Sequence, residues 1–321
     1  MAIIYKKYEE SYLTQVAQLF FEEYGWQSDD FLKRFSSFYE SDFQRKRCVR
    51  VMAIDEASGM VVGFQAYFVW PLVYGGKTVN SYQSGNSIVH RKFRGQSVFQ
   101  NLLKKAYEEL EKSEADLIIG FPIKTSLPGL LRDGWKNVFN LRWYVCIINP
   151  FAALNIFRKN LSRPNDKTEI VRPSKDLALF YPNRSREFEA WKSGYNTKEN
   201  LYFSNTLGSD TLVLQYRIQN RNRFVREAMI ASVSGSIENL TLVRQTLRKF
   251  QWRMMRAGDI FMISYAVNES CELPLVKTFK ANLFWRSPKV IYFAVKNIRA
   301  SSDSVFDPKK WLLSRADIDT W

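Results

Sequence analysis

Residues 87–110 read SIVHRKFRGQSVFQNLLKKAYEEL, and this stretch decides the fold. A short apolar run ends at Val89 and leads into a turn that carries three cations before Gly95. A helix is predicted over 97–112, because apolar residues recur there at helical spacing. These residues are Val98, Phe99, Leu102, Leu103, Ala106 and Leu110. The pattern predicts a helix that packs on a sheet and begins directly after a basic turn.

The start of this helix is a potential anion site. Its first N–H groups have no partner within the helix and carry the positive end of the helix dipole. Backbone donors can bind a phosphate at such a position, and Arg91, Lys92 and Arg94 add positive charge there. A solvated basic turn beside an ordinary packed helix explains the same residues equally well. The residues alone leave both interpretations open.

At these residues the sequence resembles the GCN5-related N-acetyltransferase (GNAT) superfamily. The segment VHRKFRGQSVF aligns with the motif of the strand, turn and helix that bind coenzyme A in that family. The resemblance implies that the backbone amides of this loop bind the pyrophosphate of acetyl-CoA, the expected co-substrate. The cofactor-binding residues that it implies are Val89, Arg91, Phe93, Arg94, Gly95, Gln96, Ser97, Val98 and Phe99.

The resemblance continues downstream and has two departures. The segment LIIGFPIKTSLPGLLRDGWKNV is similar to the next strand, the short helix and the turn of the family, with Gly134 and Trp135 at the turn. A motif position that is normally glycine is Ser97 here. The tyrosine that protonates the leaving thiolate in many members is replaced by Leu131. Because a thiol pKa lies near ~8.5, coenzyme A leaves readily as a thiolate, and such an acid is helpful without being obligatory.

The resemblance also implies catalytic groups. In the family a bulge in the strand before the motif exposes a backbone N–H to the thioester carbonyl, and here this falls to Ile88 or Val89. None of Tyr82, Asn86 and Ser87 on that strand is an obvious base.

Two other groups are candidates for the general base. We expect His90, the one histidine of the chain, to be solvated. A further hypothesis takes the carboxylate of the terminal residue, Trp321, as the base, because a chain end enters the active site in some tandem-domain acetyltransferases. A frayed or packed tail is the alternative.

The composition fits a folded protein of two domains. The chain has 321 residues, of which 46% are hydrophobic and 15% aromatic, and its net charge is +15. That charge suits an anionic ligand, a nucleic acid or an acidic membrane surface. Three separated cysteines and one histidine argue against a metal site, and no metal is expected. We expect a cytoplasmic protein, since no signal peptide or transmembrane segment is predicted.

The order of predicted elements appears twice along the chain. Strands, helices and the motif helix of the first half recur as strands over 211–233, a helix over 239–256 and closing strands. We therefore predict a diverged duplication with a GNAT-like acyl-CoA-binding domain at 1–157, a connecting segment at 158–185 and a second, degenerate GNAT-like domain at 186–321. The fold class is α/β (α+β), with a mixed, mostly antiparallel sheet flanked by helices in each domain.

The resemblance implies an N-acyltransferase that moves an acetyl group from acetyl-CoA to a small-molecule amine. An amino sugar of a bacterial surface-polysaccharide pathway is the acceptor suggested by analogy. One alternative is a peptidoglycan-type aminoacyl transferase that uses aminoacyl-tRNA. Another is a non-catalytic binding module with the same fold. Nucleic acid is not the expected partner, because aromatic residues are not interleaved with the cations of the second half. The sequence leaves the oligomeric state open, and a homodimer is one possibility.

Overall fold

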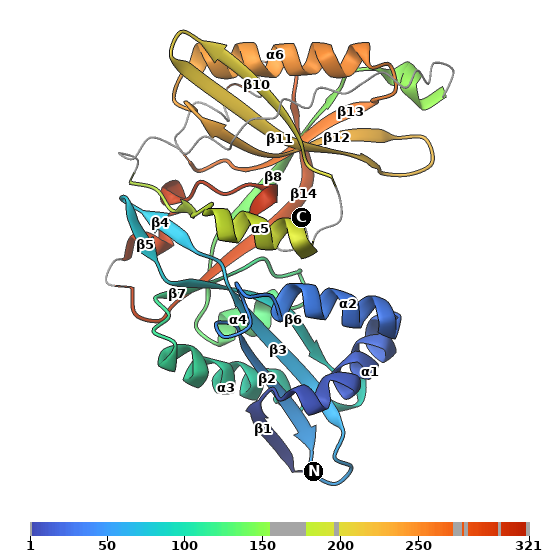
Figure 1. The fold of residues 1–321 in the computed structure, drawn as a ribbon, viewed down its shortest axis with the longest axis vertical. Helices are drawn as coiled ribbons and strands as arrows, with labels where there is room; N and C mark the ends of the chain where they lie inside the picture. Colours follow the sequence, from blue (N-terminus) through green and yellow to red (C-terminus); the bar gives the residue numbers. More distant parts are fainter. Residues whose placement is uncertain are drawn as a thin grey trace.

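One continuous sheet of 11 strands organises the molecule, with helices on both of its faces (Figure 1). This computed structural model describes residues 2–154, 178–195, 199–271, 278, 282–300 and 303–318. The first half of the chain contributes β1 (Ile3–Lys7), α1 (Leu13–Tyr24), α2 (Ser28–Tyr39), β2 (Val49–Asp55), β3 (Val61–Val69), β6 (Ser81–Val89), α3 (Val98–Lys112), β7 (Leu117–Gly120), α4 (Leu127–Arg132) and β8 (Lys136–Ile147).

The second half contributes a similar series. Its elements are α5 (Arg186–Tyr195), β10 (Leu201–Leu207), β11 (Asp210–Asn220), β12 (Arg226–Gly235), α6 (Leu240–Arg256), β13 (Met262–Asn268) and β14 (Trp285–Asn297). A small second sheet joins β4 (Leu72–Tyr74) to β5 (Lys77–Val79) and β9 (Tyr181–Pro182). The expected short helix at 274–280 and most of the expected connecting segment fall outside the described residues.

The sheet is mixed and mostly antiparallel, as the sequence predicted. Its order is β1-β2-β3-β6-β7-β14-β8-β13-β12-β11-β10. Among these neighbours, β6 with β7 and β12 with β13 are parallel, and the other pairs are antiparallel. Counted outward from the central β14–β8 pair, both sides of the sheet show the same series of antiparallel and parallel pairs. Strand β1 is one extra strand at the edge of the first half.

The two halves of the chain exchange strands at the centre of this sheet. Strand β14 lies between β7 and β8, and it pairs with both. Strand β8 lies between β14 and β13. Residues 285–297 thus complete the sheet of the first half, and residues 136–147 complete that of the second. The boundaries at 157 and 186 stay a prediction, but these hydrogen bonds cross them.

Helices cover the first-half sheet on both faces. Helix α3 buries the side chains that the sequence singled out, and these are Val98, Leu102, Leu103, Ala106 and Leu110. Helices α1 and α2 pack on the other face, where Phe20 and Phe35 contact Phe64 of β3. Helix α6 packs its buried side chains on the second-half sheet, and it lies across the top of the molecule in Figure 1.

Replacing Phe293 by alanine should destabilise both halves together. The Phe293 ring is fully buried, and its centroid lies 4.6 Å from that of Phe139 and 4.8 Å from that of Trp311. The cavity should lower the free energy of unfolding by about 3–5 kcal/mol. Because β14 is shared, chemical denaturation should still show one transition, at lower denaturant. Phe224→Ala, at a residue that is 55% exposed, is the control with little effect. Two separate transitions, of which only one moves, would contradict the prediction.

Candidate functional site

Strands β6 and β7 separate at one end of the first-half sheet. They pair in parallel from Ser81 with Leu117 to Ser84 with Gly120. Strand β7 ends there, whereas β6 continues to Val89. The last five residues of β6 are therefore outside this ladder, and the edge of β6 that faces β7 is open to a ligand in this region.

A bulge lies in this part of β6. Ala66 pairs with Gly85 and Phe64 with Ile88, so that Asn86 and Ser87 together lie opposite Gln65. Asn86 has a φ of +52°, in the left-handed region that asparagine tolerates better than most residues. Bulges re-aim the strand, and they are common beside active sites.

Gln65 holds the bulge in place. This side chain is fully buried, and its amide group donates to the Ala66 carbonyl at 2.8 Å. Its Oε1 accepts a hydrogen bond from the Ser87 hydroxyl. The Asn86 amide in turn donates to the Tyr39 hydroxyl at 2.6 Å. The polar side chains of the bulge thus bond to neighbouring elements, which fixes the end of β6.

The backbone directions beyond the bulge distinguish Ile88 from Val89. The His90 N–H donates to the Val62 carbonyl of β3 at 2.9 Å. Adjacent residues of a strand point their N–H groups to opposite edges, so Ile88 also faces β3, whereas Val89 faces the open edge. The Arg94 guanidinium donates to the Val89 carbonyl at that same edge, at 3.0 Å. Of the two candidates, Val89 is thus the one whose N–H points toward the opening.

The loop after β6 forms a cradle at the start of α3. A short 3-10 helix, η2 (Arg91–Phe93), is followed by Gly95 and Ser97, which both have positive φ, +78° and +58°. Such turns aim successive N–H groups into one concavity that suits an anion. Ser97 is the N-cap of α3, but its side chain makes no capping hydrogen bond. The first-turn donors of α3 are therefore left for another acceptor.

A cavity of about 510 Å³ opens over this cradle. It is lined by Val89, Phe93, Arg94, Gly95, Ser97, Val98, Phe99, Gln100 and Arg132. An ideal Cβ on Gly95 would meet nothing within 4 Å, so the loop is open at this residue. These residues fit a diphosphate, because the cradle supplies backbone donors and two cations line it. Most of the predicted cofactor residues come together here; Arg91 and Gln96 lie in the same loop.

Two of the predicted cations have a carboxylate partner that the sequence did not point to. Glu23, at the end of α1, accepts the Arg91 backbone N–H at 2.8 Å and the Arg91 Nε at 3.3 Å. It also pairs with the Arg94 guanidinium. Only 4% of the Glu23 side chain is exposed. Arg91 and Arg94 therefore shape the loop through Glu23, and the charge they offer to a ligand is partly neutralised.

The ionisation of Glu23 favours this arrangement. Burial of its carboxyl group raises the pKa, but the hydrogen bonds and charges of Arg91 and Arg94 outweigh burial and lower it. Glu23 is thus a carboxylate at neutral pH. It joins α1, on one face of the sheet, to the loop that precedes α3, on the other.

Other predicted residues are placed as follows. His90 was expected to be solvated, but its side chain is only 14% exposed. Its Nε2 lies 3.4 Å from the Glu22 carboxylate, and its Nδ1 accepts the Lys92 N–H. Leu131 is largely exposed at the end of α4. Trp321 lies outside the described residues.

Tyr24 lies next to the bulge. Its hydroxyl is 3.5 Å from the Ser87 carbonyl oxygen. Burial raises the pKa of Tyr24, so the hydroxyl keeps its proton at neutral pH. It is therefore a protonated hydroxyl close to the open end of β6. No pattern in the sequence predicted a role at this site for Tyr24, Glu23, Gln65 or Arg132.

In the second half, side chains occupy the position that corresponds to the cradle, at the start of α6. There the N-cap of α6 is Asn239, and its side chain accepts the Leu242 N–H at 3.0 Å. The Asp210 carboxylate accepts from the Asn239 amide and the Ser236 hydroxyl, at 2.6 and 3.1 Å. A carboxylate thus stands beside the start of α6, where it would repel a phosphate.

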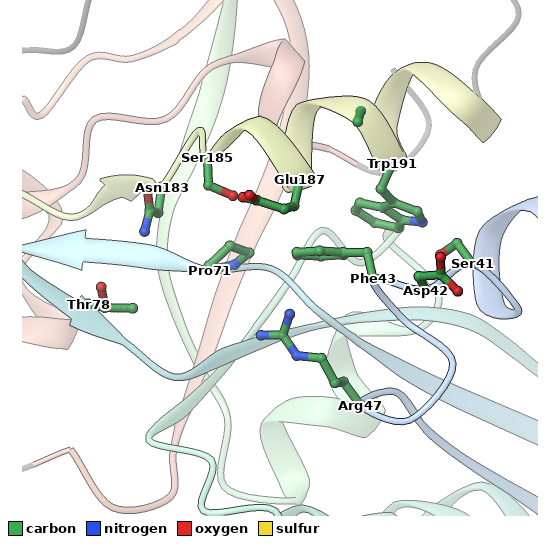
Figure 2. A pocket seen from close by; sticks show the side chains of 11 residues that line it. Ser41, Asp42, Phe43, Arg47, Pro71, Thr78, Asn183, Ser185, Glu187 and Trp191 are labelled. Atoms are coloured by element: carbon green, nitrogen blue, oxygen red, sulfur yellow. The ribbon is translucent and has the colours of Figure 1, made fainter.

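A second cavity, of about 640 Å³, lies at the opposite end of β6 (Figure 2). It is lined by Ser41, Asp42, Phe43, Arg47, Pro71, Thr78, Asn183, Ser185, Glu187, Ala190 and Trp191. Thr78 precedes the start of β6 at Ser81, whereas the cradle follows its end at Val89. At about 3.3 Å per residue the two cavities are roughly 25–30 Å apart, too far for direct transfer between them.

The first half of the chain is similar to a known domain family. Residues 4–137 match the acetyltransferase (GNAT) domain family. The match spans β1 to the start of β8 and includes the bulge, the cradle and α4. No curated protein matches the chain.

Solved structures extend the likeness to most of the chain. A GCN5-related N-acetyltransferase from Anabaena variabilis superposes with a TM-score of 0.62 and 10% identity, over 92% of this chain and 73% of that one. A probable N-acyltransferase from Enterococcus faecalis gives 0.60 at 10% identity, over 93% and 73%. Yeast N-myristoyltransferase with bound myristoyl-CoA gives 0.53 at 11% identity, over 93% and 83%. The chain thus shares the fold of these solved structures.

No group of metal-binding side chains occurs among the described residues. Nor is any described helix long and apolar enough to span a membrane.

Replacing Ser97 by glycine should stabilise the protein by about 1 kcal/mol. The left-handed conformation costs a residue with a Cβ about 1–2 kcal/mol, and part of the gain is offset by the greater unfolded-state entropy of glycine. Denaturant titration of Ser97→Gly measures the change. Ser97→Ala keeps the Cβ and should be no more stable than the wild type. Equal stabilisation by both substitutions would assign the effect to the hydroxyl instead of the backbone.

Replacing Glu23 by glutamine should destabilise the protein at neutral pH by about 1.5–3 kcal/mol, the typical contribution of hydrogen bonds to a charged group. Because the folded-state pKa of Glu23 is lowered, its stabilisation is present above the unfolded-state pKa of about 4.3 and is lost as pH falls through the folded-state pKa.

The two proteins should therefore converge in stability as the pH is lowered from 7 to 3 in a denaturation series. Glu22→Gln, at the neighbouring and more exposed carboxylate, is the control and should change stability less. A constant difference at all pH values would exclude the ionised carboxylate as the cause.

Proposed function

We propose that this protein is an N-acetyltransferase that transfers an acetyl group from acetyl-CoA to a small-molecule amine. The observation that carries the proposal is the difference between the two helix starts. The start of α3 is uncapped by a side chain and faces a cavity, whereas the start of α6 is capped by Asn239 beside Asp210. One diphosphate site is thus available in the first half.

The residues around the cradle have distinct roles in this proposal. Backbone donors at the start of α3, with Arg94 and Arg132 beside them, would hold the diphosphate of acetyl-CoA. The bound thioester would supply the electrophilic carbonyl carbon. The Val89 N–H, at the open edge of β6, would polarise that carbonyl. As the C–N bond forms and the C–S bond breaks, Tyr24 would donate a proton to the leaving sulfur, the role that Leu131 is unable to fill. The proton lost by the acylated amine would restore the Tyr24 hydroxyl.

The acceptor is proposed to be an amino sugar, by analogy only. It would reach the thioester at the open end of β6, next to the bulge. The second half would then serve to complete the sheet through β14, and we propose that it is a degenerate GNAT-like domain. The cytoplasmic location remains the prediction made above.

Two other functions make different predictions. An aminoacyl transferase would be stabilised against heat by tRNA, and a binding module would bind acetyl-CoA without forming product. A ligand at a hundredfold over its Kd should stabilise the protein by about 2.7 kcal/mol. Thermal melts with acetyl-CoA and with tRNA, followed by product mass spectrometry with a panel of amines, separate the three.

Replacing Arg132 by glutamine should weaken acetyl-CoA binding by about ten- to a hundredfold. Arg132 lines the cradle cavity from the end of α4, and a hydrogen bond to a charged group contributes about 1.5–3 kcal/mol. Acetyl-pantetheine lacks the diphosphate, so its turnover should be unchanged in Arg132→Gln. Calorimetry measures the affinity, and a thiol-release assay measures turnover.

Tyr24→Phe is the matched variant. It should leave the acetyl-CoA affinity near the wild-type value and lower kcat with both donors. If Arg132→Gln slowed acetyl-pantetheine as much as acetyl-CoA, the diphosphate would not bind in this cavity.

A further inference from the structure

The outer face of α6 is charged in a way that the matching helix of the first half is not. Helices α3 and α6 each follow a bulged strand, cover their sheet and precede a parallel strand. On α3 two of the three lysines are paired, with Lys105 bonded to Glu108 at 2.8 Å and Lys112 to Glu109 at 2.8 Å, and the helix carries three glutamates in all. The surface of α3 is therefore locally neutralised.

Helix α6 carries five cations and no carboxylate in its 17 residues. All five are exposed, and they are Arg244, Arg248, Lys249, Arg253 and Arg256. Lys249 donates to Asn205 of β10, and no ion pair within the described residues engages the four arginines. From Arg244 to Arg256 the face extends for about 18 Å, at 1.5 Å per residue. Such a continuous uncompensated face attracts a polyanionic surface.

Apolar side chains lie among these cations. Trp252 is 51% exposed and Met255 46%, and the Arg256 guanidinium lies 4.3 Å from the Trp252 ring centroid. Gln251 joins α6 to the neighbouring loop by donating to the Asn282 carbonyl at 2.7 Å. The next residue, Leu283, is 76% exposed with a φ of +63°. Three apolar side chains thus project beside the basic face.

We infer that this face docks on an anionic lipid surface. Arginines would contact lipid phosphates, and Trp252, Met255 and Leu283 would enter the interfacial region, as on amphipathic helices that lie on membranes. The apolar residues decide between lipid and RNA, because leucine and methionine gain nothing from a phosphodiester backbone. In Figure 1, α6 lies at the top of the molecule and α3 in its lower half, so docking leaves the cradle open to solvent.

Vesicle co-sedimentation tests this inference. The full chain is mixed with vesicles of phosphatidylcholine, with or without 30 mol% phosphatidylglycerol. We expect binding to the anionic vesicles only, and loss of that binding at high salt. Each cation near an anionic surface contributes about fivefold to binding, so Arg244→Gln, Arg248→Gln and Arg253→Gln together should weaken it on the order of a hundredfold.

A matched variant separates this face from net charge. Lys104→Gln, Lys105→Gln and Lys112→Gln together remove the same charge from α3 and should retain wild-type vesicle binding. Trp252→Ala should weaken binding with all charges kept. Thermal melts check that each variant is folded.

Three results would overturn the inference. The first is equal loss of binding in both triple variants, and the second is no binding to anionic vesicles. The third is binding of tRNA, in a gel-shift assay, that depends on the α6 arginines while vesicles do not bind.

Discussion

The pairing of β14 with β7 and β8 is the constraint on which the rest of the structure depends. Without β14, the sheet that carries the bulge and the cradle would end at β7, and Gly120 would have no neighbour on that side. With it, Phe293 packs against Phe121 and Phe139 in a buried cluster to which both halves contribute. The second half of the chain is therefore part of the framework of the first, even though its own helix start is closed.

The two halves share a fold but differ in where their helices carry uncompensated positive charge. In the first, an uncapped helix start faces a cavity, while the three lysines of the helix are matched by three glutamates. In the second, Asn239 and Asp210 close the helix start while the exposed face of the helix carries only cations. The net charge of +15 is thus distributed unevenly over the surface. Five cations without a carboxylate lie on α6, the helix whose start is capped.

Much of the fold could be predicted from the sequence, because it rests on local patterns. The apolar spacing of α3 set its buried face, and the turn before Gly95 located the cradle. The loop geometry also followed, since Gly95 marks a left-handed residue. The Gly85–Asn86 pair inside a predicted strand is a further signal that points to the bulge, because glycine in a strand often marks one.

Long-range partners were beyond reach of the sequence. Glu23 lies 68 residues from Arg91, and no local pattern marks it as the partner of the loop cations. Gln65 reads as an ordinary polar residue in a strand, although it fixes the bulge. The strand exchange was hidden for the same reason, since β8 and β14 look like the closing strands of their own halves. His90 was expected in solvent because the position of Glu22 could not be foreseen.

The strand exchange has a consequence for how the chain reaches its native state. Gly120 at the end of β7 pairs with Ala294 of β14, so the ribosome must add 174 residues (294 − 120) before this neighbour exists. Contacts between such distant segments form slowly, because a long loop must close first. During synthesis the edge of β7 is exposed and can pair with another chain. Protection of that edge by a chaperone, or rapid translation of the second half, would therefore favour a high yield of folded protein.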